Sequence, residues 1–73
     1  MSNHPACKLR LGLITATIWK NDTFYTVDLS RSYKDHTGQW QSTTSFGHAD
    51  LLNLSKCVQR AENWIAGQAN APQ

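Results

Sequence analysis

The order of hydrophobic patterns along the chain constrains the fold more than any other feature. Three stretches that alternate polar and apolar residues come first, and a stretch with helical periodicity follows. A period of two predicts strands, whereas apolar residues at steps of three and four predict an amphipathic helix. We expect strands at 13–20, 24–31 and 39–46, a shorter first strand at 8–11, and a helix over about 48–66.

This order predicts an α+β fold: a curved antiparallel sheet of three to four strands followed by one C-terminal amphipathic helix (ββββα). In the strand over 13–20, the apolar face carries Ile14, Ala16 and Ile18, and the opposite face carries Thr15, Thr17 and Trp19. In the last strand, we assign Trp40 and Phe46 to the core and Gln41, Thr43 and Ser45 to the opposite face. A single helix covers one face of such a sheet, so the other face is expected to be open for binding.

The apolar stripe of the helix is wide. Leu51, Leu54, Val58, Ala61 and Ile65 recur at helical spacing. Three further residues widen the stripe: Leu52, Cys57 and Trp64. Either the core is deep, or the helix is shared with a second subunit, and the sequence leaves both interpretations open.

Chain length limits how stable a single copy can be. Seventy-three residues make one domain, expected over 8–67 between a flexible N-terminus (1–7) and a flexible tail (68–73). A domain of this size buries only about 60% of its unfolded surface, so a homodimer is the expected source of further burial. Two cysteines do not make a disulfide framework, which favours a reduced, cytoplasmic setting. The sequence contains no apolar run of membrane-spanning length and no signal-peptide pattern, so we expect no membrane partner.

Catalysis has little basis in the sequence. The three histidines, His4, His36 and His48, have no Cys or carboxylate at metal-ligand spacing. No phosphate-binding loop or nucleophile motif occurs either. We therefore expect the protein to have no enzymatic activity and to bind no metal, cofactor or small-molecule substrate.

The charge distribution favours a polyanionic partner for the sheet. Up to Lys34 the chain carries five basic and two acidic residues, a balance of +3, whereas the remainder carries two and three, a balance of −1. The expected open face is rich in hydroxyls and includes Trp19, and basic residues are expected around it: Lys8, Arg10, Lys20, Arg31 and Lys34. Such a surface can bind phosphates and stack a base. Threonine is also common in strands for steric reasons, and Trp19 can instead be a dimer contact.

Several residues make the chain similar to a known family. Val27-Asp28-Leu29 leads into a basic-aromatic segment (31–34), an Asp35 to Gly38 turn follows, and a polar strand ending at Phe46 precedes a Leu-rich helix. In this order the chain resembles the single-stranded-DNA-binding domain of the coactivator Positive Cofactor Four and its small bacterial relatives, grouped with the Whirly proteins. The resemblance spans roughly residues 9–65. It implies a dimer whose curved sheets hold single-stranded DNA with aromatic and basic side chains.

The predicted function is non-catalytic binding of single-stranded nucleic acid, DNA rather than RNA, with low sequence specificity, as in a transcription or replication accessory factor. The strand over 39–46 carries no Lys or Arg, where the coactivator has a Lys-rich segment. The alternative function is a protein-interaction or assembly module of the same fold. The residues predicted to contact nucleic acid are Lys8, Arg10, Trp19, Lys20, Arg31, Tyr33 and Lys34.

Overall fold

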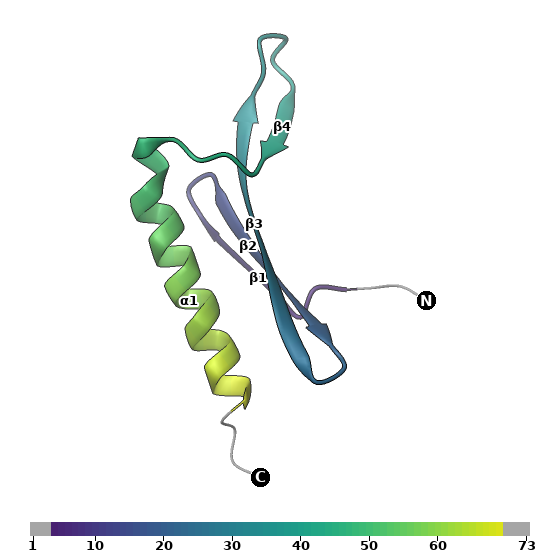
Figure 1. Ribbon diagram of the computed structural model, residues 1–73. Helices are drawn as coiled ribbons and strands as arrows, with labels where there is room; N and C mark the ends of the chain where they lie inside the picture. The colour runs from purple at the N-terminus through teal and green to yellow at the C-terminus, as the bar shows by residue number, and fades with distance from the viewer. Residues whose placement is uncertain (1–3, 70–73) are drawn as a thin grey trace.

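The computed structural model describes residues 4–69 and has the predicted ββββα order (Figure 1). The elements are β1 (Cys7–Leu11), β2 (Ile14–Asn21), β3 (Phe24–Lys34), β4 (Trp40–Thr43), a 3-10 turn (His48–Asp50) and α1 (Leu51–Ala69). The strands form one antiparallel sheet in the order β1-β2-β3-β4. The predicted α+β fold is therefore confirmed.

Tight turns join the first three strands. Gly12 begins the two-residue turn between β1 and β2 with a φ of 61°, a conformation that glycine adopts without a steric penalty. A Cβ atom at this position would lie 3.0 Å from Asn53 Nδ2 on the helix. Asp22, in the turn between β2 and β3, also has a positive φ of 41°, which Asp tolerates better than most residues. These turns fix which side chains of the sheet face α1.

The core lies between α1 and the first two strands (Figure 1). Ile14, Ala16 and Ile18 of β2 are at most 1% exposed, and they pack with the buried Cys57 and Ala61 of α1. Tyr25 of β3 meets Trp64 edge-to-face, with ring centroids 5.8 Å apart. Partly buried apolar residues of β1 complete this layer: Cys7, Leu9 and Leu11. The faces predicted for residues 14–19 are therefore confirmed.

The hairpin of β3 and β4 projects from this core (Figure 1). β3 pairs with β2 over residues 24–31 and with β4 over residues 31–34, so the two pairings share only Arg31. Among the described residues, no strand pairs with the second edge of β3 over 24–30. The radius of gyration is 14.1 Å, compared with about 11 Å for a compact domain of this length. One copy of the chain is therefore less compact than a typical domain of the same length.

Several predicted boundaries are corrected by the structure. β3 runs to Lys34 instead of residue 31, and α1 runs to Ala69 instead of residue 66. β1 begins at Cys7, and Ala6 N donates a hydrogen bond to Ile18 O at 2.7 Å, so the sheet extends into the segment expected to be flexible. The remaining parts of the two predicted flexible ends, residues 1–3 and 70–73, lie outside the described residues.

The predicted faces of the last strand are wrong for Trp40, Gln41 and Thr43, whereas Phe46 packs against the core as predicted. β4 ends at Thr43, whose hydroxyl accepts a hydrogen bond from Ser45 N at 3.1 Å, and the chain then leaves the sheet. Because alternation holds only within a strand, Trp40 and Phe46 do not share a face. Phe46 packs against the core from the connecting segment, whereas Trp40 is 60% exposed. Register places Gln41 and Thr43 on the helix side and Trp40 on the opposite side.

Candidate nucleic-acid interface

The face of the sheet opposite α1, here called the open face, is continuous across all four strands. Residues paired directly across antiparallel strands share a face, so the register defines its members. They are Lys8, Arg10, Thr15, Thr17, Trp19, Asn21, Phe24, Thr26, Asp28, Ser30, Ser32, Lys34, Trp40 and Ser42. Three cations and one carboxylate are among them, and hydroxyls occupy most other positions. The open face is therefore polar, with a net positive charge.

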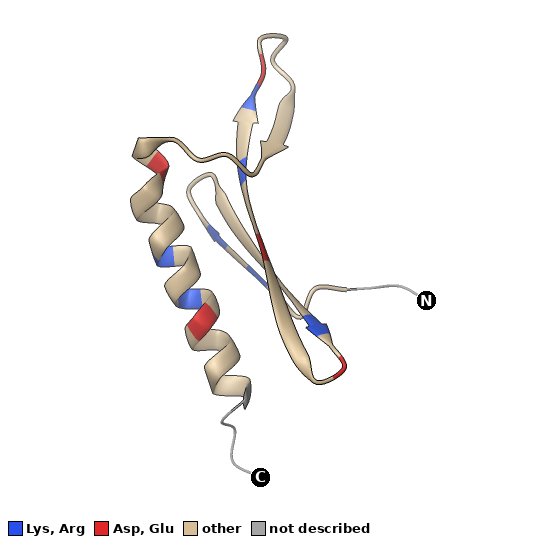
Figure 2. Cartoon of the chain, in the orientation of Figure 1, with Lys and Arg blue, Asp and Glu red and all other residues tan. Residues whose placement is uncertain are grey.

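Two of these cations lie at the β1 edge. Lys8 and Arg10 are both exposed, and they pair with Thr17 and Thr15 of β2. Strands carry five of the seven Lys and Arg positions of the chain, and the other two lie on α1 (Figure 2). Side chains that alternate with Leu9 on a strand point away from the helix. The β1 edge therefore adds positive charge beside a row of threonine hydroxyls.

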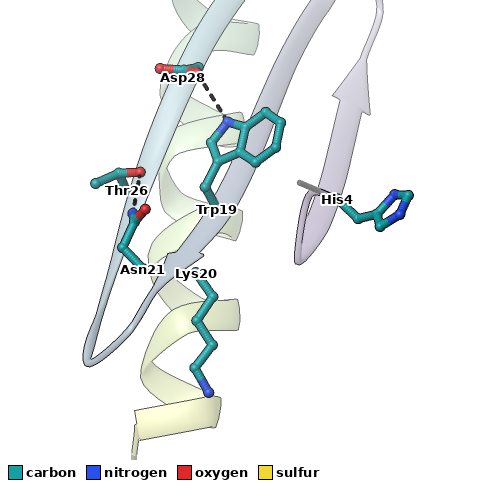
Figure 3. Close-up of a pocket in the computed structure, with 6 residues that line it drawn as sticks. All are labelled: His4, Trp19, Lys20, Asn21, Thr26 and Asp28. Carbon is teal, nitrogen blue, oxygen red and sulfur yellow. Dashed lines mark hydrogen bonds between the residues drawn. The ribbon is translucent and has the colours of Figure 1, made fainter. Parts of the chain in front are cut away.

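Trp19 is held in one orientation by a carboxylate of the neighbouring strand. Its indole Nε1 donates a hydrogen bond to Asp28 Oδ2 at 3.0 Å (Figure 3). The two residues border a hollow of about 360 Å³. The lining residues are His4, Trp19, Lys20, Asn21, Thr26 and Asp28. An indole fixed beside a hollow is a preorganised surface on which a flat group can stack.

A second aromatic group lies at the other end of the open face. Lys34 and Trp40 pair across β3 and β4, and Lys34 Nζ lies 5.5 Å from the centre of the Trp40 ring. Trp19 of β2 pairs with Thr26, which lies on β3 as Lys34 does. Positions 26 and 34 on a strand are separated by about 26 Å. The two tryptophans therefore lie far apart on one face, with hydroxyl side chains between them.

Arg31 does not belong to the open face. It pairs with the buried Ile14, and its Nε donates to Ser45 O at 3.2 Å and lies 3.2 Å from Asp50 Oδ2. Tyr33 follows two residues later on the same side, and the Arg31 guanidinium carbon lies 5.7 Å from its ring centre. The expectation that Arg31 lies around the open face is wrong, because odd positions of β3 face the helix side. Tyr33, also predicted to contact nucleic acid, lies on that same side. Arg31 instead ties β3 to the start of the helix.

The other predicted contact residues lie on or beside the open face. Lys8, Arg10, Trp19 and Lys34 share it. Lys20 pairs with Tyr25, which packs toward the helix, but Lys20 is exposed and lines the hollow beside Trp19. Four of the seven predicted residues thus lie on one surface, and a fifth lies at its margin.

Trp40 is a candidate residue that the sequence interpretation assigned to the core. The sequence carries a signal in the Asp35 to Gly38 turn, which the structure closes with a hydrogen bond from Asp35 N to Gln39 O at 2.9 Å. Counting outward from a hairpin closed at these residues places Lys34 opposite Trp40, on the side away from Arg31. Turn length therefore fixes the face that strand alternation alone left ambiguous.

The turn that supports this hairpin is built around one carboxylate. Asp35 Oδ1 accepts hydrogen bonds from the Thr37 hydroxyl at 2.6 Å, from Thr37 N at 2.9 Å and from Gln39 N at 3.0 Å. Gln41 Nε2 donates to Oδ2 at 3.1 Å. The Thr37 hydroxyl, followed by the Gln39 amide, lowers the pKa of Asp35 to about 2. The charged carboxylate thereby orders the loop that presents Lys34 and Trp40.

The part of the chain that the structure describes, residues 4–69, lacks two other kinds of feature. Within that range, no group of three or more His, Cys, Asp or Glu side chains is arranged to hold a metal ion. No helix in the same range is long and apolar enough to cross a membrane. The open face and the hollow at Trp19 therefore provide the polar features from which a function can be argued.

Comparison with known proteins adds no constraint. No protein-family model, curated protein or solved structure matches the chain. The similarity to Positive Cofactor Four described above stays a prediction. The geometry of the open face is therefore the basis for a functional proposal.

Proposed function

We propose that the open face binds single-stranded nucleic acid without catalysis, DNA in preference to RNA, and with low sequence specificity. One observation carries the proposal. The register brings three cations and two tryptophans onto the face that α1 leaves uncovered: Lys8, Arg10, Lys34, Trp19 and Trp40. A role as an accessory factor in transcription or replication belongs to the same proposal.

Cationic and aromatic side chains contribute to binding in different ways in such an interface. Lys and Arg attract phosphates whatever the sequence, and each base stacked on an aromatic ring contributes about 1–3 kcal/mol. Trp19 and Trp40 lie at opposite ends of the open face, so one strand that crosses it can stack a base at each end. Threonine and serine hydroxyls between them are donors and acceptors for phosphate oxygens and base edges. This combination favours an unpaired strand, whose bases are accessible.

Tryptophan fluorescence tests the proposal directly. We expect a 20-nucleotide single strand of mixed sequence to quench the fluorescence and to bind more tightly than the matching duplex. Affinity should fall steeply between 50 and 200 mM salt. Lys8→Glu with Arg10→Glu should weaken binding at least about tenfold at 50 mM salt. A matched RNA strand, expected to bind more weakly, tests the preference for DNA.

The matched control reverses two charges on the other side of the molecule. Lys56→Glu with Arg60→Glu changes the net charge equally, but both residues lie exposed on α1. If the two double variants weaken binding equally, the effect depends on net charge alone, and the open face is not the binding site. Absence of binding to single-stranded DNA, RNA and duplex at 50 mM salt would overturn the function in favour of the protein-interaction module.

We also propose that the partner of one copy is a second copy, docked beside β3. Val27, Leu29, Val58, Ala61, Glu62 and Ile65 line a groove of about 230 Å³ between β3 and α1. Val27 and Val58 remain 37% and 46% exposed. The unpaired edge of β3 over 24–30 runs along the same side. A second copy would cover the groove and the edge together, and it would supply the burial that an extended, small chain lacks.

Light scattering tests this dimer. The wild-type protein should have twice the 8.2 kDa mass of one chain at micromolar concentration. Val58→Glu should shift the mass toward one chain, because a charge in the groove opposes apolar burial. Leu52→Glu is the matched control, since Leu52 is 67% exposed and does not line the groove. A single-chain mass for the wild type over the whole concentration range would exclude the dimer.

A further inference from the structure

We propose that the hollow at Trp19 receives one nucleobase and favours bases that carry an exocyclic amino group: cytosine, adenine and guanine over thymine and uracil. This inference rests on the proposed function, and it adds a modest base preference to an interface whose affinity comes mainly from phosphates and stacking. The acceptor groups that border the hollow are its basis.

The aromatic wall of the hollow is fixed before any ligand arrives. Trp19 Nε1 is bound to Asp28 Oδ2 at 3.0 Å, so the indole does not need to reorient on binding (Figure 3). The hollow measures about 360 Å³, within the range of small-ligand sites. A base that stacks on this indole can direct its polar edge toward β3, whose Asp28 and Thr26 line the hollow. Preorganisation of this kind lowers the entropic cost of binding.

Acceptors dominate the polar side of the hollow. Asp28 is an exposed carboxylate whose pair of oxygens can accept about four hydrogen bonds, and the indole uses one of them. Asn21 Nδ2 donates to Thr26 Oγ1 at 3.1 Å, which turns its amide nitrogen toward β3 and leaves the carbonyl oxygen as an acceptor (Figure 3). Lys20 supplies a cation at the margin for the phosphate that accompanies the base. The hollow therefore pairs an acceptor-rich side with one lysine.

The bases differ in the donors that they can present to these acceptors. Cytosine and adenine each present an amino group, N4 or N6, which donates to a carboxylate, and guanine presents N2. Thymine and uracil carry a carbonyl oxygen where cytosine carries its amino group. The single donor on that edge of thymine and uracil, N3–H, lies between two carbonyl oxygens, which the negative charge of Asp28 repels. The preference is therefore a consequence of one carboxylate beside one fixed ring.

Oligo-dC and oligo-dT of equal length test the inference, since they differ in base but not in phosphate charge. At pH 7.5 and 50 mM salt we expect the wild-type protein to bind oligo-dC about fivefold more tightly. Asp28→Asn keeps an acceptor for the Trp19 indole but replaces the other oxygen with a donor. The ratio should fall to one or invert, with oligo-dT gaining affinity.

Asp22→Asn is the matched control. It removes the same charge from the neighbouring turn, where Asn also tolerates the positive φ of 41°. It should leave the dC:dT ratio unchanged. Equal binding of the two oligonucleotides by the wild type would overturn the base preference while the proposed function stands, as would a ratio that Asp28→Asn does not change. Failure of both oligonucleotides to bind would instead remove the proposed function.

Discussion

The two faces of the sheet differ in what surrounds them, although the same strands build both. On the helix side of β2, Ile14, Ala16 and Ile18 are almost fully buried. On the open side of the same strand, Thr15, Thr17 and Trp19 are half-buried and meet hydroxyls and cations of their neighbours. Neighbouring residues of one strand thus contribute to different properties. Substitutions on the helix side should change stability, and those on the open side should change binding.

β3 shows the same contrast with two basic residues. Arg31 lies on the helix side and bonds to Ser45 and Asp50, whereas Lys34 lies on the open face against Trp40. They are three positions apart, so they fall on opposite faces of the strand. A positive charge in this chain therefore has no single role, and its face decides whether it supports the fold or meets a ligand.

The largest expected effect is on stability, from truncation on the helix side. Ile18→Ala should lower the free energy of unfolding by about 2–4 kcal/mol, because it leaves a cavity in a core of few residues. Thr17→Ala, one residue away on the open face, should cost less than about 1 kcal/mol. Urea unfolding at one protein concentration measures both. Equal losses in the free energy of unfolding at the two positions would contradict the assignment of stability to the helix side and binding to the open side.

An intermediate effect is expected from the two basic residues of β3. Arg31→Ala should destabilise the fold by about 1 kcal/mol, since it removes a partly screened ion pair and a bond to the backbone. Lys34→Ala should change stability by less than about 0.5 kcal/mol but weaken binding to single-stranded DNA. Thermal unfolding and fluorescence titration of both variants separate the roles. The opposite assignment of effects would show that the faces of β3 are misplaced.

The smallest expected effect is a change in the pKa of Asp35, in the turn between β3 and β4. Hydrogen bonds, first that of the Thr37 hydroxyl, hold the pKa of Asp35 at about 2 in the folded protein, below the unfolded value of about 3.9. The contribution of Asp35 to stability is therefore complete above pH 4 and is lost as the pH falls toward 2. Thr37→Val should raise the pKa of Asp35, measured from its carboxyl chemical shift. Thr23→Val, in a different turn, should leave that pKa unchanged.

The pattern of the chain predicted the order of elements and the faces of its central strand. Alternation over residues 13–20 is regular, and Ile14, Ala16 and Ile18 lie in the core as expected. The pattern did not predict the end of β4, because a threonine hydroxyl bonding to Ser45 N ends the strand where the sequence still alternates. Alternation continued to Phe46 therefore predicts the wrong face for Trp40. Proximity in sequence groups Arg31 and Tyr33 with Lys34, but alternation along the strand places Lys34 on the opposite face.

The sequence by itself determined the ββββα order, since periods of two and of about 3.6 depend only on local backbone geometry. It also determined that the strand half is basic. Only the tertiary structure decided which cations share a surface, that Trp19 is fixed by Asp28, and that Trp40 joins the open face. These features depend on strand register, which is set by turns and by contacts between segments far apart in the chain.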